Sequence, residues 1–156
     1  MTTLPPLPSV RRAGPEDVPA LVAANVAMAL ETEGKALDPG LVEQGVRGLM
    51  ERPEAGFYLV VGDGPAPAGS LMVTPEWTDW RNGWFWWIQS VYVAPAWRGR
   101  GVYRALHQEV ERRARAAGRI VGLRLYVERE NTGARQVYAR LGMEETSYRL
   151  YEVPLT

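Results

Sequence analysis

The segment that decides the fold reads Val91-Tyr-Val-Ala-Pro-Ala-Trp-Arg-Gly-Arg-Gly-Val-Tyr103. Its β-branched and aromatic start, ended by Pro95, predicts the end of a strand, and its glycine-bearing end predicts a loop that opens a helix. The first amides of a helix have no partner within the helix and bind anions, and glycines let a phosphate approach the backbone. Arg98 and Arg100 add positive charge. The segment therefore predicts a cradle for a pyrophosphate.

Other interpretations of this loop can be compared with its residues. A nucleotide P-loop requires Gly-x-x-x-x-Gly-Lys-Ser/Thr, which the sequence lacks. A dinucleotide-binding turn needs a small third residue, and counted from Gly99 that place holds Arg104. If only the two glycines are considered, the loop could equally be an ordinary turn that starts a helix and binds no ligand.

The flanking sequence alternates between helical and strand-like patterns. Apolar residues recur at helical spacing from Pro15 toward Gly34, after Pro39, from Val102 to Gly118 and from Asn131 to Gly142. Runs that predict strands cover Ser9–Ala13, Phe57–Val61, Ser70–Thr74, Trp84–Val93, Val121–Val127 and Tyr148–Val153. This order implies the α/β (α+β) class with a partly antiparallel and partly parallel sheet. No linker or repeat interrupts it, so we expect a single domain over residues 1–156 with a proline-rich leader, residues 1–8.

The loop and its surroundings resemble the GCN5-related N-acetyltransferase (GNAT) family. That family's phosphate loop reads Arg/Gln-x-x-Gly-x-Gly/Ala, and here it is Arg98-Gly-Arg-Gly101-Val-Tyr103, in which Tyr103 replaces the usual small residue. The resemblance is strong from Trp84 to Tyr151 and weaker before that. A second family pattern, Asn-x-x-Ala-x-x-x-Tyr-x-x-x-Gly, is matched by Asn131, Ala134, Tyr138 and Gly142.

The resemblance implies the fold and the cofactor. The GNAT fold is a mixed, mostly antiparallel sheet of six to seven strands with about four helices, in which the central strands splay. Backbone groups left unpaired by the splay need partners, and the pantetheine arm of acetyl-CoA, the implied cosubstrate, would supply them. The implied cofactor-binding residues are Val91, Tyr92, Val93, Arg98, Gly99, Arg100, Gly101, Val102, Tyr103 and Asn131.

The implied reaction is direct transfer of an acetyl group from acetyl-CoA to an amine. The amine must be neutral to attack, and the departing thiolate benefits from a proton. By resemblance, Tyr138 is the acid, and Gln89 stands where many relatives carry a glutamate. Because an amide cannot accept a proton at neutral pH, we expect Gln89 to orient a water or the amine. The candidate bases are Glu76, which we prefer, and Asp79, Glu31 and Glu33.

The same residues have structural explanations that the sequence leaves open. Asn131 is also a good helix N-cap, and Tyr138 is also a good core aromatic with a solvated hydroxyl. Glu76 is also typical of a solvated turn carboxylate. His107, the only histidine, lies one residue past the apolar stripe of its helix. We expect it to be partly exposed and without a catalytic role.

Composition narrows the classes of function. The chain carries 18 basic and 18 acidic side chains, so it lacks the basic excess of a nucleic-acid binder. With no cysteine and one histidine, we expect no disulfide, no cysteine nucleophile and no metal site. No segment reads as a signal peptide or a membrane span, which predicts a soluble, cytoplasmic enzyme without membrane partners.

The acceptor is not identified by the sequence, nor is the preferred acyl length. Five tryptophans lie between Trp77 and Trp87, and aromatic faces with nearby carboxylates suit a cationic amine. We therefore prefer a small amine or amino-acid-like acceptor over a protein terminus, and an exposed aromatic edge is compatible with a homodimer. Two other functions stay open: a non-catalytic acyl-CoA-binding or sensing module, which Gln89 favours, and an interaction domain that uses the tryptophans.

Overall fold

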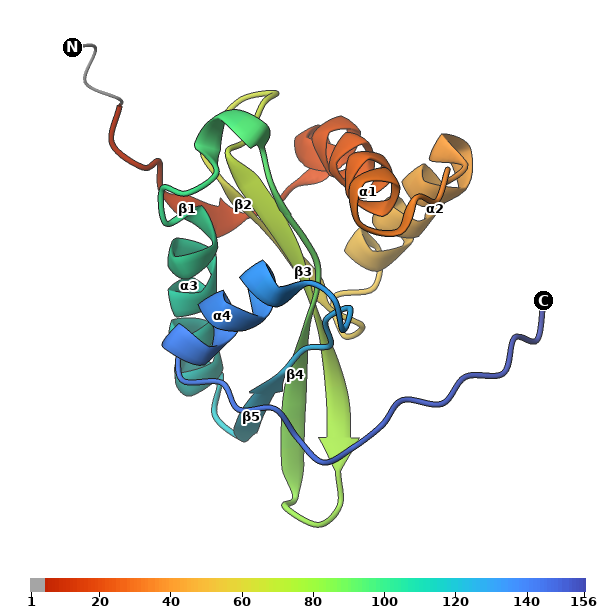
Figure 1. The fold of residues 1–156 in the computed structure, drawn as a ribbon, viewed down its shortest axis with the longest axis vertical. Coiled ribbons are helices and arrows are strands. Elements are labelled where there is room, and N and C mark those ends of the chain that lie inside the picture. The colour runs from red at the N-terminus through yellow and green to blue at the C-terminus, as the bar shows by residue number, and fades with distance from the viewer. Residues whose placement is uncertain (1–4) are drawn as a thin grey trace. The chain divides into compact units, whose positions relative to one another are not determined.

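The computed structural model describes residues 5–156, so residues 1–4 of the expected leader lie outside it. The chain divides into two compact units, one ending at Leu125 and the other spanning Tyr126–Thr156. The second unit contains helix α4 (Thr132–Arg140). The prediction of a single domain over residues 1–156 stays a prediction. The first unit contains strands β1 (Val10–Arg12), β2 (Phe57–Val61), β3 (Gly69–Thr78), β4 (Gly83–Val93) and β5 (Ile120–Arg124), and helices α1 (Val18–Glu33), α2 (Pro39–Met50) and α3 (Val102–Ala117) (Figure 1).

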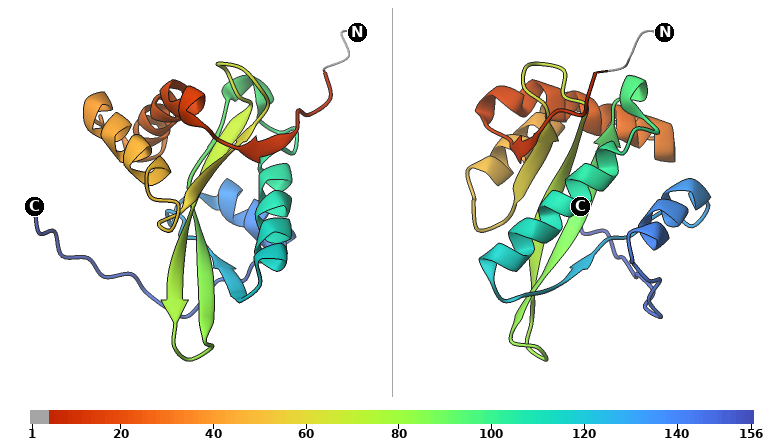
Figure 2. Two further views of the ribbon diagram at one scale, coloured as in Figure 1. Left: turned by 180° about the vertical axis from the view of Figure 1, so that it is seen from behind. Right: turned by 90° about the vertical axis from the view of Figure 1, so that its left-hand side faces the viewer.

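The first unit is a sheet covered by helices on both faces. Its five strands run in the order β1-β2-β3-β4-β5. The first three pairings are antiparallel, and β4 pairs with β5 in parallel through the crossover helix α3. Helices α1 and α2 lie on one face and α3 on the other, as the views in Figure 2 show. The expected mixed, mostly antiparallel α/β sheet with four helices is therefore present in the described chain.

The predicted number of strands was too high. The sheet in the described residues has five strands instead of six to seven. The expected last strand, Tyr148–Val153, is not a strand, and the strand expected at Val121–Val127 ends at Arg124. Apolar and aromatic residues favour extended backbone, but a strand also needs a neighbour that pairs with its N–H and C=O groups. The residues after Arg124 form no such ladder here.

Two hydrophobic clusters hold the layers together. The first joins one sheet face to α3 through fully buried side chains, among them Leu59, Leu71 and Leu106. The second joins the other face to α1 and α2 through Val18, Leu21, Val46, Tyr58 and Val60. Since burial of apolar surface is the main favourable contribution to folding, these clusters fix the sheet between its helices.

A buried ion pair anchors the start of the chain to α1. Arg11 on β1 donates two hydrogen bonds of 2.8 Å to the carboxylate of Asp17, whose side chain is only 2% exposed. The Gly14 amide donates a third, also of 2.8 Å. The hydrogen bonds from Arg11 are the main reason that the pKa of Asp17 lies below its usual value. Asp17 therefore stays ionised inside the fold.

Strand β4 contains one irregularity that changes which residues face each helix layer. On β3, Ser70 and Met72 are two residues apart, yet their partners on β4, Tyr92 and Gln89, are three apart. The extra residue forms a bulge, and Ser90 has a left-handed φ of +52°. Before the bulge Trp86 packs on the α3 side, and after it Val91 and Val93 do.

Candidate active site

The loop predicted to bind phosphate lies at the end of β4. Val93, the last residue of β4, pairs with Gly69 on β3. A short 3₁₀ turn (Pro95–Trp97) follows, and α3 begins directly after Gly101. Proline fits the first position of such a turn because its missing N–H has no partner there anyway. The strand, loop and helix therefore follow one another as the sequence predicts.

The glycines of this loop have backbone conformations that other residues rarely adopt. Gly99 has φ +73° and Gly101 has φ +81°, and the space beside Gly99 is open to at least 4 Å. Within residues 5–156 no side chain caps the N-terminus of α3. The first turn of a helix offers amides that have no partner inside the helix, and here these begin at Val102. An uncapped helix start behind two small residues fits a diphosphate, because its amides and dipole favour negative charge.

The two loop arginines already have partners in the protein. Arg98 donates from Nε to the Val93 carbonyl at 3.0 Å and from Nη2 to Glu31 of α1 at 2.7 Å. Arg100 donates to the Pro5 carbonyl at 2.6 Å, and its guanidinium lies 4.3 Å from the centre of the Trp97 ring. In this arrangement the loop offers an anion its amides, while the arginines brace the loop.

Tyr103, the residue that departs from the family pattern, packs along the helix. It lies against the first hydrophobic cluster, and its hydroxyl is 3.3 Å from Nδ1 of His107 one turn later. His107 is 4% exposed, so the expectation of a partly exposed histidine was wrong. The histidine helps to cover the core, and desolvation lowers its pKa against a smaller opposing effect of Glu111.

Strands β4 and β5 stop pairing halfway along β4. Their last paired residues are Trp87 and Arg124, whereas β4 continues to Val93. The segment that holds Val91, Tyr92 and Val93 therefore has β3 on one side and no β5 ladder on the other. Such a divergence is what the resemblance led us to expect in the middle of the sheet.

Polar side chains gather on the sheet face that α1 and α2 partly cover. The Gln89 side chain donates from Nε2 to Thr74 Oγ1 at 2.6 Å. Glu76, two residues along β3, accepts a 2.7 Å hydrogen bond from Nη1 of Arg124 on β5. Glu76 on β3 pairs with Phe85 on β4, and Arg124 on β5 pairs with Trp87 on β4. Strand β4 lies between the two charged residues, so their ion pair crosses over it.

The other candidate bases lie elsewhere in the first unit. Glu31 is engaged by Arg98 at the loop. Glu33 ends α1 and is exposed. Asp79 lies in the exposed turn between β3 and β4. Among the four carboxylates, Glu76 is the one on the same sheet face as Gln89.

The tryptophans separate into distinct surroundings. Trp86 packs edge-on against Phe57 at the α3 face, with ring centres 5.3 Å apart. Trp77 and Trp84 pair edge-on at 4.9 Å near the far end of the β3–β4 hairpin. Trp80 is 90% exposed in the hairpin turn. Trp87 is thus the tryptophan that shares a face with Glu76 and Arg124.

The remaining predicted residues belong to the second unit. Asn131 caps α4, since its Oδ1 accepts a 3.1 Å hydrogen bond from the Ala134 amide. The structural role that the sequence left open for Asn131 is therefore present. Tyr138 lies in the last turn of α4, and burial raises the pKa of its hydroxyl above the usual value. The hydroxyl is therefore protonated at neutral pH, as an ordinary tyrosine is.

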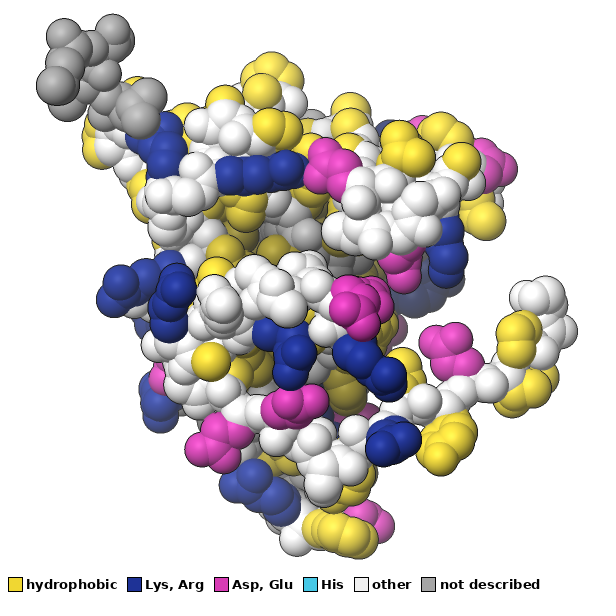
Figure 3. Space-filling model, in the orientation of Figure 1, with side chains coloured by type: hydrophobic (Ala, Val, Ile, Leu, Met, Phe, Trp, Pro, Cys, Tyr) yellow, Lys and Arg dark blue, Asp and Glu magenta, His cyan; other side chains and the backbone are white. Residues whose placement is uncertain are grey.

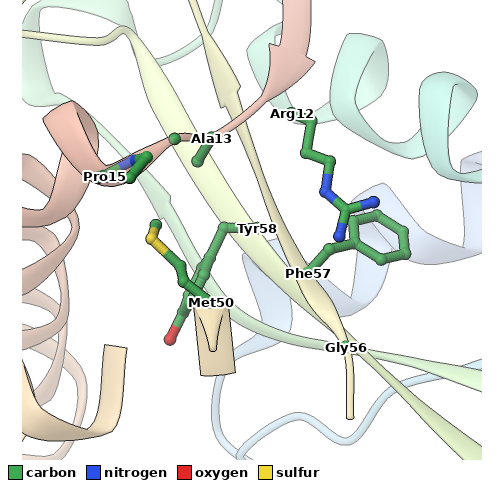
Figure 4. A pocket seen from close by; sticks show the side chains of 8 residues that line it. Arg12, Ala13, Pro15, Met50, Gly56, Phe57 and Tyr58 are labelled. Atoms are coloured by element: carbon green, nitrogen blue, oxygen red, sulfur yellow. The ribbon is translucent and has the colours of Figure 1, made fainter. Parts of the chain in front are cut away.

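In the rest of the described chain, the cavity and the charged surface are poorer candidates for a ligand site than the loop before α3. A cavity of about 140 Å³ lies between the start of β2 and the end of α2, with Met50 and Tyr58 turned toward it (Figure 4). Its volume is well below the ~300 Å³ from which ligand pockets start. The face drawn in Figure 3 mixes basic and acidic side chains without a large patch of either sign. Within residues 5–156 no helix is long and apolar enough to cross a membrane, and no cluster of three or more potential metal ligands exists.

Three features of this site were not found from the sequence. The bulge at Ser90 has no glycine or proline signal. Thr74 and Arg124 become visible as site residues only once the strand register places them beside Gln89 and Glu76. The alternation of side chains along β3 and β5 is the one sequence signal from which the shared face of these residues could have been found.

Comparisons with known proteins agree with this arrangement. The sequence profile described as the acetyltransferase (GNAT) family matches residues 27–143. An uncharacterized N-acetyltransferase of Methanocaldococcus jannaschii is 35% identical over 98 residues, which cover 62% of this chain and 42% of that protein. The chain thus spans less than half the length of this relative.

Two solved structures share the fold over nearly the whole chain. A possible acetyltransferase from Clostridium difficile has a TM-score of 0.88 and 38% identity, covering 96% of this chain and 99% of that one. A predicted acetyltransferase from Clostridium acetobutylicum, solved with acetyl-CoA, has a TM-score of 0.76 and 17% identity, covering 94% and 96%. At this lower identity the likeness is one of fold.

Proposed function

Because the chain belongs to the acetyltransferase (GNAT) family, we propose that it moves an acetyl group from acetyl-CoA directly to the amine of a small acceptor. One observation carries the proposal: an uncapped helix start behind Gly99 and Gly101 follows the strand whose ladder with β5 ends early. A diphosphate and a chain of amides are the two kinds of group that such neighbouring features bind. The likeness to a fold solved with acetyl-CoA supports the same ligand.

The chain's own residues have distinct roles in binding. The amides of Val102 and Tyr103 hold the diphosphate, with the Gly99–Gly101 turn allowing close approach. Backbone groups of Val91, Tyr92 and Val93 hydrogen-bond the amides of the pantetheine arm. In this proposal Arg98 and Arg100 keep the loop in place, and Asn131 positions the start of α4 and adds a cofactor contact.

The catalytic roles follow from the needs of acyl transfer. Acetyl-CoA supplies a thioester, whose carbonyl carbon is open to attack by a neutral amine. A backbone N–H beside the Ser90 bulge, turned out of the regular ladder, polarises that carbonyl. Gln89, held by Thr74, orients the acceptor, and Glu76 takes its proton. Tyr138 gives a proton to the departing sulfur, since its hydroxyl is protonated at neutral pH.

Binding and turnover measurements test this function separately. Calorimetry and thermal shift with acetyl-CoA should show saturable binding, and thiol release should exceed background with at least one member of a panel of small amines. Binding without turnover on any amine would replace the enzyme with a non-catalytic acyl-CoA-binding module. If acetyl-CoA does not bind, both the enzyme and the acyl-CoA-binding module are excluded, and a domain that uses its tryptophans for protein interaction is the function that is left.

A further inference from the structure

The ion pair between Glu76 and Arg124 lies where an acceptor would approach the reacting centre. Arg124 and its partner Trp87 are the last rung of the β4–β5 ladder, and the guanidinium reaches Glu76 over Phe85, just on the paired side of the point where the two strands separate. Gln89 and Thr74 form the next polar contact along the same face. Two residues along a strand span about 7 Å, so this ion pair is within one small molecule's length of Gln89.

The pair is accessible and has capacity for more hydrogen bonds. The side chains of Arg124 and Glu76 are 31% and 45% exposed. The single contact between them joins Nη1 of Arg124 to Oε1 of Glu76. A guanidinium has five N–H donors and a carboxylate accepts at two oxygens, so each group can bind a ligand while keeping the other.

Aromatic rings hold Arg124 in a fixed position. Its guanidinium carbon lies 3.5 Å from the centre of the Phe85 ring and 6.0 Å from that of Trp87. An exposed ion pair by itself adds little to stability, and its long side chains usually move. Stacking on Phe85 removes much of that freedom before a ligand arrives, which favours recognition of a planar carboxylate.

We infer that Glu76 and Arg124 select a zwitterionic acceptor of the α-amino-acid type, with the carboxylate on Arg124 and the amino group at Glu76. One carbon separates the two charges of such a molecule, which matches the direct contact between the two side chains. The inference rests on the proposed function and names its substrate class. A peptide N-terminus lacks the adjacent carboxylate and would leave Arg124 without its ligand.

The transfer step balances with these groups. The acceptor ammonium gives one proton to the Glu76 carboxylate, and the neutral nitrogen then forms a bond to the acetyl carbonyl carbon. The carbon–sulfur bond breaks, and its electron pair leaves with sulfur, which receives a proton from the Tyr138 hydroxyl. Solvent then carries the proton held by Glu76 back to the Tyr138 phenolate. The second amine proton is released to solvent, so an N-acetylated amino acid and a free thiol result.

Matched acceptors and matched variants test the inference. Each α-amino acid in the panel is compared with its carboxamide and with the amine that lacks the carboxylate. The variants are Arg124→Gln, Arg124→Lys, and Arg115→Gln as control. Arg115 forms an exposed 2.6 Å ion pair with Glu111 on α3, so the control removes an equivalent pair elsewhere. Loss of a charge-assisted hydrogen bond predicts that Arg124→Gln raises KM for the amino acid about 10- to 100-fold with little change in kcat.

The carboxamide provides the decisive contrast. The ratio of kcat/KM for the acid to kcat/KM for the carboxamide should fall about 10- to 100-fold in Arg124→Gln, Arg124→Lys should restore part of this ratio, and Arg115→Gln should keep the wild-type ratio. Equal loss on acid and carboxamide, or a wild type that does not prefer the acid, would overturn the inference while leaving acetyl transfer intact.

A binding measurement separates the two proposals. Calorimetry of the amino acid with CoA-saturated protein should show binding that Arg124→Gln weakens to the same extent as it raises KM. If no acceptor is acetylated, the proposed activity fails, and this titration still decides the recognition: binding lost in Arg124→Gln supports it, and no binding overturns it.

Discussion

Gly101 and Gly118 lie at opposite ends of α3 and both have a positive φ, +81° and +70°, but their ψ angles differ, at 17° and 154°. A side chain strains the backbone at both positions, and more at Gly118, but only Gly101 lies beside the uncapped amides. We therefore expect Gly101→Glu to weaken acetyl-CoA binding by at least about 10-fold, because its carboxylate competes for the amides and repels the diphosphate.

The Gly118→Glu variant is the control, and it should bind acetyl-CoA as wild type does. Calorimetry measures the affinity of each variant for acetyl-CoA at a temperature at which thermal melting shows both to be folded. Equal affinities for both variants would place the diphosphate somewhere other than at the start of α3.

Tyr138→Phe tests the proposed acid. Removing the hydroxyl should lower kcat by about 10²-fold, the lower range for general acid catalysis, with little change in acetyl-CoA affinity. Tyr151→Phe is the control, since Tyr151 is 89% exposed outside any helix or strand. Steady-state kinetics and calorimetry measure the two quantities, and an unchanged kcat would exclude Tyr138 as the proton donor.

Glu76→Gln tests the proposed base. The rate of an enzyme with a carboxylate base rises with pH as the base loses its proton, and the amide has no such ionisation. We expect kcat/KM to fall by about 10²-fold and its pH profile to change shape, while the free energy of unfolding changes by less than ~1 kcal/mol. Glu111→Gln, which breaks the pair with Arg115, is the control. A profile identical to that of wild type would shift the role of base to another group.

Asp17→Asn tests the buried ion pair. The folded-state pKa of Asp17 is lowered, so its contribution to stability is complete above the unfolded pKa of about 3.9 and is lost as pH falls through the folded value. At pH 7 the variant should be less stable by about 2–3 kcal/mol, and this difference should shrink at low pH.

Asp63→Asn is the control for Asp17, because Asp63 also contacts Arg11, at 3.0 Å, but is 96% exposed. Denaturant unfolding of both variants at pH 7 and pH 3 gives the comparison. Similar losses for the two variants would mean that burial adds nothing to the Arg11–Asp17 pair.

His107 offers a direct test of burial in α3. Desolvation lowers its folded pKa, so the imidazole should titrate below the usual value of about 6.5 in the native protein. The unfolded chain takes up the proton first, so the neutral histidine's contribution to stability is present above about pH 6.5 and declines below it. As the chain has one histidine, its NMR resonance is unambiguous. A midpoint at or above 6.5 would contradict the burial.

Residue patterns predicted most of the elements but not the contacts between them. β2 has the predicted bounds, Phe57–Val61, and β4 begins one residue before the predicted Trp84, because dense runs of β-branched and aromatic residues strongly favour strands. The loop glycines were likewise identifiable, since left-handed turns leave few other choices.

The features that sequence patterns did not predict depend on contacts between residues that are distant along the chain. Tyr148–Val153 has strand-like residues but no ladder, and strand formation needs both. His107 is one position off the apolar stripe, yet Tyr103 and the core cover it. The contact of Glu76 with Arg124 follows from a register across three strands that no local pattern records.

The core does not need the single extra residue at Ser90 to direct the side chains of β4 to their faces. Before it, even-numbered residues such as Trp86 reach the α3 core, and after it odd-numbered ones such as Val93 do. Deleting Ser90 would restore strict alternation, and it would leave Val91 and Val93 facing α3 and Tyr92 facing the other side. The same deletion would remove the backbone turn proposed to face the thioester. A single deletion at Ser90 should therefore harm the proposed chemistry more than the fold, whereas a single deletion elsewhere in β4 would turn every later side chain to the opposite face.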